Sequence, residues 1–251
     1  MTETMIKLTD PSFHRTLCRI GLFGDIGIIL VGALLLVLWD LSGLDLAAVR
    51  MFGTARGFSL KDAFVPSMLL HQGGRWLSLA LLVWLLVNAL WPLPPAVDMS
   101  RVQRWGWLAV TVLCLALVSS LKQASLTSCP WDLAEFGGTA HYVSHWQFGV
   151  ADGGGGRCFP AGHPSAAFGF FAGYFALRPW NRRAARLWLT GVIGLGILFG
   201  VAQLVRGAHY PSHTFYTAWL CWTLTAVLYN WANYIGRRRA SKRDAAPPGS
   251  D

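Results

Sequence analysis

Apolar residues fall into six stretches along the chain, separated by polar segments of very different length. An α-helix needs about 20 residues to cross the hydrocarbon core of a bilayer, with a range of about 17 to 25. The second, third and fourth stretches are short and need flanking residues to span, and Pro164 before the fourth is typical of a helix start. We therefore predict an all-α polytopic membrane protein, a bundle of six transmembrane helices. The predicted spans are 21–38, 77–91, 107–121, 165–180, 187–205 and 214–235.

The composition supports a membrane protein and excludes other classes. Hydrophobic residues make up 54% of the chain and charged residues only 13%, whereas soluble domains carry about a quarter charged residues. Disordered chains are polar and rich in charge, so disorder is excluded as well. The first apolar stretch lacks a strongly basic start and an evident small-residue cleavage site, so we expect a retained helix rather than a signal peptide. Residues 1–251 are interpreted as a single membrane domain.

The positions of the charges predict the orientation. The net charge is +9, and with the N-terminus inside, fourteen of the 21 Lys and Arg residues lie on the inner side. Cytoplasmic segments of membrane proteins are enriched in Lys and Arg, so both termini are expected in the cytoplasm, with 237–251 as a basic cytoplasmic tail. No separate basic domain exists, so nucleic acid is not expected as a partner. The seven outer cations are Arg50, Arg56, Lys61, Arg75, Lys122, Arg157 and Arg206.

Histidine and cysteine show the opposite distribution. In this orientation six of the seven histidines lie on the outer side, and His163, His209 and His213 lie at span ends. Cys129 and Cys158 lie in the same outer segment. Facing an oxidising periplasm, these two cysteines are expected to form a disulfide. The alternative is a pair of unpaired thiols.

Three clusters of cationic or reactive residues lie at the outer ends of the spans. Lys122 follows the third span, segment 159–164 precedes the fourth, and segment 206–213 joins the fifth to the sixth. Lys and Arg bind phosphate by charge, and Gly162 and His163 precede a helix start, where free N–H groups favour an anion. Two histidines can divide phosphoryl transfer, because one attacks phosphorus and the other protonates the leaving oxygen. Cationic side chains neutralise the transferred group, so no metal or other cofactor is expected.

In this order, the clusters resemble the type 2 phosphatidic acid phosphatase superfamily, the membrane lipid phosphate phosphatases related to vanadium haloperoxidases. That family carries the motifs K-x6-R-P, P-S-G-H and S-R-x5-H-x3-D. The resemblance implies that His209 is the nucleophile and that His163 is the general acid for the leaving group. It also implies that Lys122 and the Gly162 backbone bind the phosphate oxygens. The matching segments are Lys122-x6-Cys129-Pro130, Pro160-Ala161-Gly162-His163 and His209-x3-His213.

Several positions of the family pattern are altered here. The arginine of the first motif is Cys129, the serine of the second is Ala161, and the Ser-Arg pair of the third is Ala202-Gln203. Arg206 lies one helical turn beyond Gln203, and residues three apart on a helix share a face. We therefore expect Arg206 to bind the same phosphate, with Gln203 as a further donor.

The aspartate of the third motif is replaced by His213. An aspartate would accept a hydrogen bond from the His209 imidazole and stabilise its cationic form. Neutral His213 can accept one bond and orient the ring, but it supplies no negative charge. Arg157, held near the site by a Cys129–Cys158 disulfide, is a candidate for the missing cation of the first motif.

These features predict a phosphatase of the bacterial-type inner membrane with its active site at the outer, periplasmic surface. The predicted reaction is hydrolysis of a phosphate or pyrophosphate monoester of a lipid through a phosphohistidine, with membrane lipids as the other partners. One alternative is transfer of the phosphoryl group to another lipid, such as a lipid A-type glycolipid. Another is a catalytically silent lipid-binding protein on the same fold, which the altered Arg, Ser and Asp positions favour. A channel or transporter is less well supported, because polar residues at mid-span are few.

Overall fold

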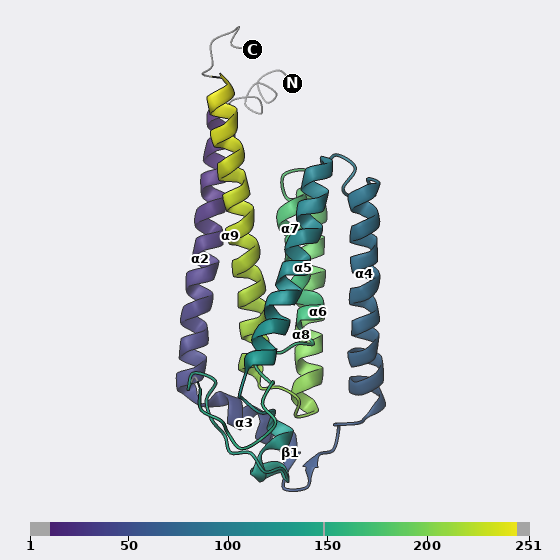
Figure 1. The fold of residues 1–251 in the computed structure, drawn as a ribbon, viewed down its shortest axis with the longest axis vertical. Helices are drawn as coiled ribbons and strands as arrows, with labels where there is room; N and C mark the ends of the chain where they lie inside the picture. The colour runs from purple at the N-terminus through teal and green to yellow at the C-terminus, as the bar shows by residue number, and fades with distance from the viewer. Residues whose placement is uncertain (1–10, 148, 245–251) are drawn as a thin grey trace.

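The computed structural model of the protein describes residues 11–147 and 149–244. Long helices run along one axis, and short elements close one end of the bundle (Figure 1). The bundle helices are α2 (Pro11–Ser42), α4 (Gly73–Leu90), α5 (Arg101–Ala124), α6 (Ser165–Phe168), α7 (Ala172–Leu177), α8 (Arg182–Val205) and α9 (Pro211–Asp244). The short elements at that end are α3 (Leu44–Arg50), the antiparallel strands β1 (Gly53–Thr54) and β2 (Gly57–Phe58), the π-helix η1 (Val65–Gln72), and the 3-10 helices η2 (Pro130–Asp132) and η3 (Ala134–Phe136). A further 3-10 helix, η4 (Gly169–Phe171), lies within the bundle between α6 and α7.

Successive bundle helices alternate in direction. Figure 1 shows α2 and α9 side by side on one flank and α4 on the other, with α5, α6, α7 and α8 between them. As a result, the segments 43–72, 125–164 and 206–210 gather at one end, which we call the capped end. The opposite end, which holds the connections 91–100 and 178–181, is called the open end. The capped end is the one for which the charge pattern predicts an outer location.

Four helices in the described part of the chain are long and apolar enough to cross a membrane. They are Leu22–Ser42, Val65–Leu90, Arg101–Ala124 and Arg182–Val205. The helix that contains the predicted span 77–91 begins twelve residues earlier, because η1 continues directly into α4. The polar run His71–Arg75 interrupts the apolar pattern there without interrupting the helix.

The other two predicted spans are helical but are not among the helices that are long and apolar enough to cross a membrane. The stretch 165–180 is divided into α6, η4 and α7, which form a shorter apolar segment, Ser165–Leu177. Most of this segment is buried by its neighbours, and a Cβ atom on Gly173 would lie only 2.3 Å from Trp188 Nε1. The stretch 214–235 lies inside the longer helix α9. Six transmembrane helices therefore remain a prediction, of which four are supported by length and composition.

Aromatic side chains form the core around the divided segment. The buried rings of Trp107, Phe170 and Trp222 belong to one cluster, in which α5, η4 and α9 meet. Where the helical hydrogen bonding changes at η4, the indole N–H of Trp188 donates to the carbonyl of Phe170 at 2.8 Å. A buried backbone carbonyl is thereby satisfied at the irregularity, as burial requires.

A bidentate ion pair lies between helices near the open end. Both terminal nitrogens of Arg178 donate to the two carboxylate oxygens of Asp25, at 3.0 and 2.8 Å, and the side-chain amide of Asn230 donates to Asp25 at 3.0 Å. The guanidinium lies over the rings of Phe175 and Tyr229, at 4.6 and 4.8 Å from their centroids. This pair fixes α2 to the end of α7 and to α9, and it gives Asp25 a structural role.

At the capped end, side chains from distant segments fix the loop that joins α8 to α9. The backbone N–H of Trp131 donates to the carbonyl of Gly207 at 2.9 Å. Gly207 has φ +71, and its missing side chain leaves room for the ring of Phe58. Asp45 accepts a hydrogen bond from the backbone N–H of Ser212 at 3.0 Å, at the N-terminus of α9. A carboxylate at this position stabilises a helix start.

Candidate active site

The three clusters found in the sequence come together at the capped end. Lys122 lies in the last turn of α5, His163 lies two residues before α6, and His209 lies between α8 and α9. A Cβ atom placed on Gly162 would be 3.2 Å from Lys122 Cδ and 3.4 Å from its Nζ. The Lys122 side chain thus passes directly over Gly162. The absence of a side chain at Gly162 keeps the ammonium group close to the turn that carries His163.

His163 is fixed by a hydrogen bond and by two rings. Its Nε2 donates to the carbonyl of Leu70 at 3.1 Å, so this nitrogen carries the proton of the neutral ring. The rings of His71 and Phe199 lie 4.4 and 4.7 Å from it, centroid to centroid. Gly74 permits this approach, because a Cβ atom there would lie 2.9 Å from His163 Cε1. Burial, reinforced by nearby positive charge, lowers the pKa of His163 to about 3.

His209 is buried, and its Nδ1 atom contacts two neighbouring side chains. Nδ1 lies 3.3 Å from Cys158 Sγ and 3.5 Å from Nδ1 of His213. Burial first, and then the charge of Lys122, hold the pKa of His209 well below its usual range. A neutral imidazole with its Nδ1 side engaged presents Nε2 as the nucleophilic nitrogen.

His213 lies in the first turn of α9 and is completely buried. Its Nδ1 faces His209, and its Nε2 has no hydrogen-bond partner among the described residues. Burial holds the pKa of His213 well below its usual range, and the neighbouring His209 and His145 act in the same direction. The neutral form of His213 is therefore favoured near pH 7, and its role in orienting His209 stays a prediction.

Arg206 and Gln203 lie together, and they connect to a residue that the motifs did not identify. Arg206 Nη1 donates to Gln203 Oε1 at 3.3 Å, so the amide nitrogen of Gln203 faces the other way. That nitrogen lies 3.5 Å from Nδ1 of His71, whose ring packs against His163. His71 carries no motif, and in the sequence it falls in the polar segment before the predicted second span. Only the folded chain brings its η1 position next to α6.

Arg157 was the predicted candidate for the missing arginine of the first motif, and the structure adds Arg75 as a second cation. Arg157 is exposed, and its backbone is left-handed with φ 57. Arg75, in the first turn of α4, lines a small groove with Ser165 and Ala166. Its charge also contributes to the lowered pKa of His163. Arg75, and not Arg157, is thus among the charges that act on His163. A role for Arg157 in binding phosphate stays a prediction.

The predicted disulfide between Cys129 and Cys158 is formed. It joins the segment after α5 to the segment before α6, so it brackets the loop that contributes to the cap. Cys158 is fully buried beside His209. Because its sulfur is bonded to Cys129, it carries no proton and can only accept from the His209 imidazole.

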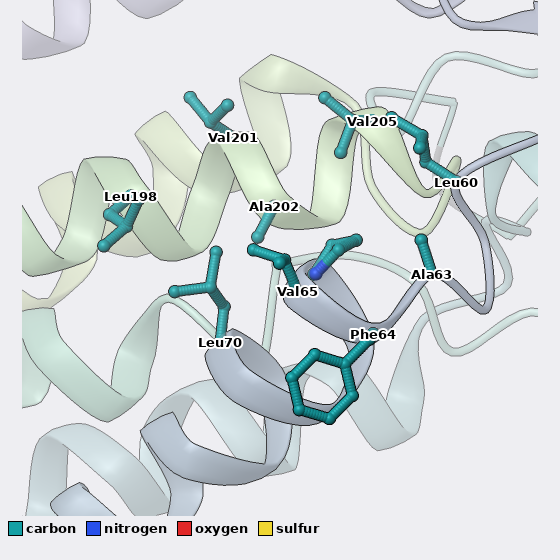
Figure 2. A pocket seen from close by; sticks show the side chains of 10 residues that line it. Leu60, Ala63, Phe64, Val65, Leu70, Leu198, Val201, Ala202 and Val205 are labelled. Atoms are coloured by element: carbon teal, nitrogen blue, oxygen red, sulfur yellow. The ribbon is translucent and has the colours of Figure 1, made fainter.

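An apolar groove of about 450 Å³ borders the site (Figure 2). It lies between η1 with the segment before it and the last turns of α8. Leu70, whose carbonyl accepts from His163, lines it, and so do Ala202 and Val205, the neighbours of Gln203 and Arg206. The remaining lining residues are Leu60, Ala63, Phe64, Val65, Pro66, Leu198 and Val201. The groove places a purely hydrocarbon surface next to the cationic site.

Two groups of residues in the described part of the chain have ligand atoms close enough to hold a metal ion. The first is Cys129, Cys158 and His209, but the disulfide removes the thiolates that a metal would need. The second is Asp40, Asp45 and His145. Three of its four carboxylate oxygens already accept hydrogen bonds from protein groups.

Comparison with known families agrees with this arrangement. The sequence model of the PAP2 superfamily matches residues 104–237, just over half of the chain. The chain belongs to the PAP2 superfamily. Comparison with curated proteins and with solved structures gives no match. PAP2 phosphatases act on phosphate esters, and the match contains Lys122, His163, His209 and His213 but neither η1 nor α3.

Proposed function

We propose that this PAP2 protein hydrolyses the phosphate or pyrophosphate group of a membrane lipid through a phosphohistidine on His209. The observation that carries the proposal is the juxtaposition at the capped end. There, two buried neutral histidines lie near Lys122 and Arg206, directly beside an apolar groove. Such a site matches an anionic head group joined to a hydrocarbon chain.

The first step transfers the phosphoryl group to the protein. Nε2 of His209 attacks phosphorus, the bond between phosphorus and the lipid oxygen breaks, and His163 gives a proton to that oxygen. In the second step, water attacks phosphorus and gives a proton to His163, and the P–N bond breaks to release phosphate. Lys122 and Arg206 neutralise the equatorial oxygens in both steps.

The protonation state of His163 depends on the substrate. Nearby positive charges contribute to its lowered pKa, and the same charges attract phosphate. A bound phosphate dianion offsets them and raises the pKa of His163, because an opposite charge favours the protonated form. The general acid is therefore loaded with its proton when the substrate binds.

The apolar groove supports a lipid rather than a soluble phosphate ester. Its lining is almost entirely hydrocarbon, and burying a lipid chain there is favourable at about 25 cal/mol per Å² of apolar surface. By the charge pattern, the site faces the periplasmic side of the inner membrane, with both termini in the cytoplasm.

The test is release of phosphate by the purified protein in detergent or proteoliposomes. The substrates are a phosphatidate, a polyprenyl pyrophosphate and a phosphorylated lipid A-type glycolipid. We expect release from at least one lipid and a loss of at least about 10³-fold in His209→Ala. The matched control is His141→Ala, because His141 is exposed on the cap. Release that persists in His209→Ala would refute the nucleophile, and phosphate found on a second lipid would favour the transferase.

A further inference from the structure

Two largely buried carboxylates contact the first turns of α9, which also carry His213. Asp40 is in the last turn of α2, and Asp45 is in the first turn of α3. The side chain of Asp40 is 9% exposed, and Asp45 is 4% exposed. No lysine or arginine of the described chain forms an ion pair with either one. Buried charges without a cation are costly, so their retention calls for an explanation.

The hydrogen bonds of these carboxylates come from neutral donors. Asp45 accepts from the indole of Trp39 at 2.9 Å and from the backbone and hydroxyl of Ser212. Asp40 accepts at Oδ2 from the hydroxyl of Tyr216 at 2.8 Å and from the indole of Trp146. Neutral donors satisfy the oxygens but leave the negative charge uncancelled.

The remaining oxygen of Asp40 faces His145. The distance from Asp40 Oδ1 to His145 Nε2 is 3.5 Å. The His145 ring is buried, stacks on Phe159 at 4.3 Å, and meets the ring of His213 edge to face at 5.7 Å. His213 in turn lies 3.5 Å from His209. The chain of groups therefore runs from Asp40 through two imidazoles to the proposed nucleophile.

We propose that Asp40, acting through His145, supplies to the His209–His213 pair the negative charge that His213 itself lacks. This inference rests on the proposed function. When Nε2 of His209 bonds to phosphorus while Nδ1 keeps its proton, the ring becomes cationic. A carboxylate held in a low-dielectric surrounding stabilises that cation without moving. Asp40 and His145 are positioning residues here, since neither touches the phosphoryl group.

A double-mutant cycle tests the inference in the full-length protein. In the wild type, Asp40→Asn keeps an oxygen for Tyr216 and removes the charge; we expect kcat to fall 10- to 100-fold with KM within about twofold. In the His213→Asp background, a carboxylate stands directly beside His209, so Asp40→Asn is expected to lower kcat less than about threefold. Equal losses in both backgrounds would overturn the inference, because they indicate a structural effect.

A matched control separates the charge of Asp40 from its contacts. Tyr216→Phe removes one hydrogen bond to Asp40 but no charge, and we expect it to lower kcat less than about threefold. A loss as large as that of Asp40→Asn would contradict a role for the charge. Chelation by EDTA is expected to leave the wild-type rate unchanged. A loss restored by a divalent cation would replace the inference with a metal site at Asp40 and His145.

Orthovanadate provides a readout that needs no lipid. It mimics the transferring phosphoryl group at the nucleophile, and its affinity can be measured by titration calorimetry. We expect its Kd to rise at least tenfold in Asp40→Asn and to change little when the substitution is made in His213→Asp. Unchanged binding in Asp40→Asn would overturn the inference. Absence of lipid hydrolysis in the wild type would instead overturn the proposed function.

Discussion

Two aspartates of the same helix, α2, lie at opposite ends of the bundle and have different surroundings. Asp25 makes a bidentate ion pair with Arg178 and accepts a further bond from Asn230. Asp40 accepts from Tyr216 and Trp146 and faces the imidazole of His145. The charge of Asp25 is neutralised by the guanidinium of Arg178, whereas no lysine or arginine of the described residues neutralises the charge of Asp40.

The difference separates a structural region from a reactive one. At the open end, a bidentate ion pair with a further amide donor holds three helices together. At the capped end, neutral histidines, cations and unpaired carboxylates lie close together, which is an arrangement typical of catalytic sites. Substitutions at the open end should therefore change stability, and substitutions at the capped end should change activity.

The largest effect on folding is expected from Arg178→Met, which keeps much of the packing but leaves Asp25 as a buried, unpaired charge. Breaking a buried ion pair in this way costs about 3–5 kcal/mol. We expect a lower melting temperature in detergent, with the kcat of the folded protein close to that of the wild type. The matched variant is the double change Asp25→Asn and Arg178→Met, which removes both charges and should recover most of the loss. Equal destabilisation in the two variants would contradict this explanation.

A smaller effect is expected from acidification, and it should originate at the capped end. The pKa of His163 is lowered from 6.5 to about 3 in the folded protein. The unfolded chain therefore binds more protons below pH 6.5, and stability is lost as the pH falls. Between pH 6.5 and pH 5.0, His163 alone accounts for about 2 kcal/mol. His209 and His213 act in the same direction, because burial lowers their pKa values as well.

The loss of stability between pH 6.5 and pH 5.0 is measured by denaturing the protein in detergent at the two pH values. His163→Gln retains an amide that can donate to the Leu70 carbonyl but cannot titrate, so its stability should fall less on acidification. His141→Gln, at an exposed position, should behave like the wild type. An unchanged pH dependence in His163→Gln would show that His163 is not held neutral by burial.

The smallest effect is expected from Gly162→Ala. The added methyl group would stand 3.2 Å from Lys122 Cδ, so the lysine side chain must move by a few tenths of an ångström. We expect kcat/KM for a lipid phosphate to fall about tenfold, equivalent to about 1.4 kcal/mol, with little change in melting temperature. Gly155→Ala is a control, because nothing lies near the Cβ position of Gly155. A normal rate in Gly162→Ala would argue against phosphate binding by Lys122 above this turn.

Features that depend on the local sequence pattern could be predicted from the sequence alone. Apolar stretches predicted where helices run, and motif spacing identified Lys122, His163 and His209, which the fold brings to one end. The disulfide also followed from two cysteines in one outer segment. The division of α6 from α7 was not predictable, since it depends on burial by distant rings such as Trp188.

Contacts between residues far apart in the sequence were also missed. His71 lies 92 positions before His163, and Asp40 lies 105 positions before His145, so no spacing rule connects them. The pattern indicated that His213 lacks the charge of an aspartate. It did not indicate that another helix brings a carboxylate toward the same histidine pair.

The most direct test of the account is to trap the covalent intermediate. The wild-type protein is quenched under alkaline conditions during turnover of a lipid phosphate, digested, and analysed by tandem mass spectrometry. We predict one added phosphoryl group on His209, with none in His209→Ala and normal labelling in His141→Ala. Phosphate on a different residue, or turnover in the wild type without any phosphorylated histidine, would contradict the account.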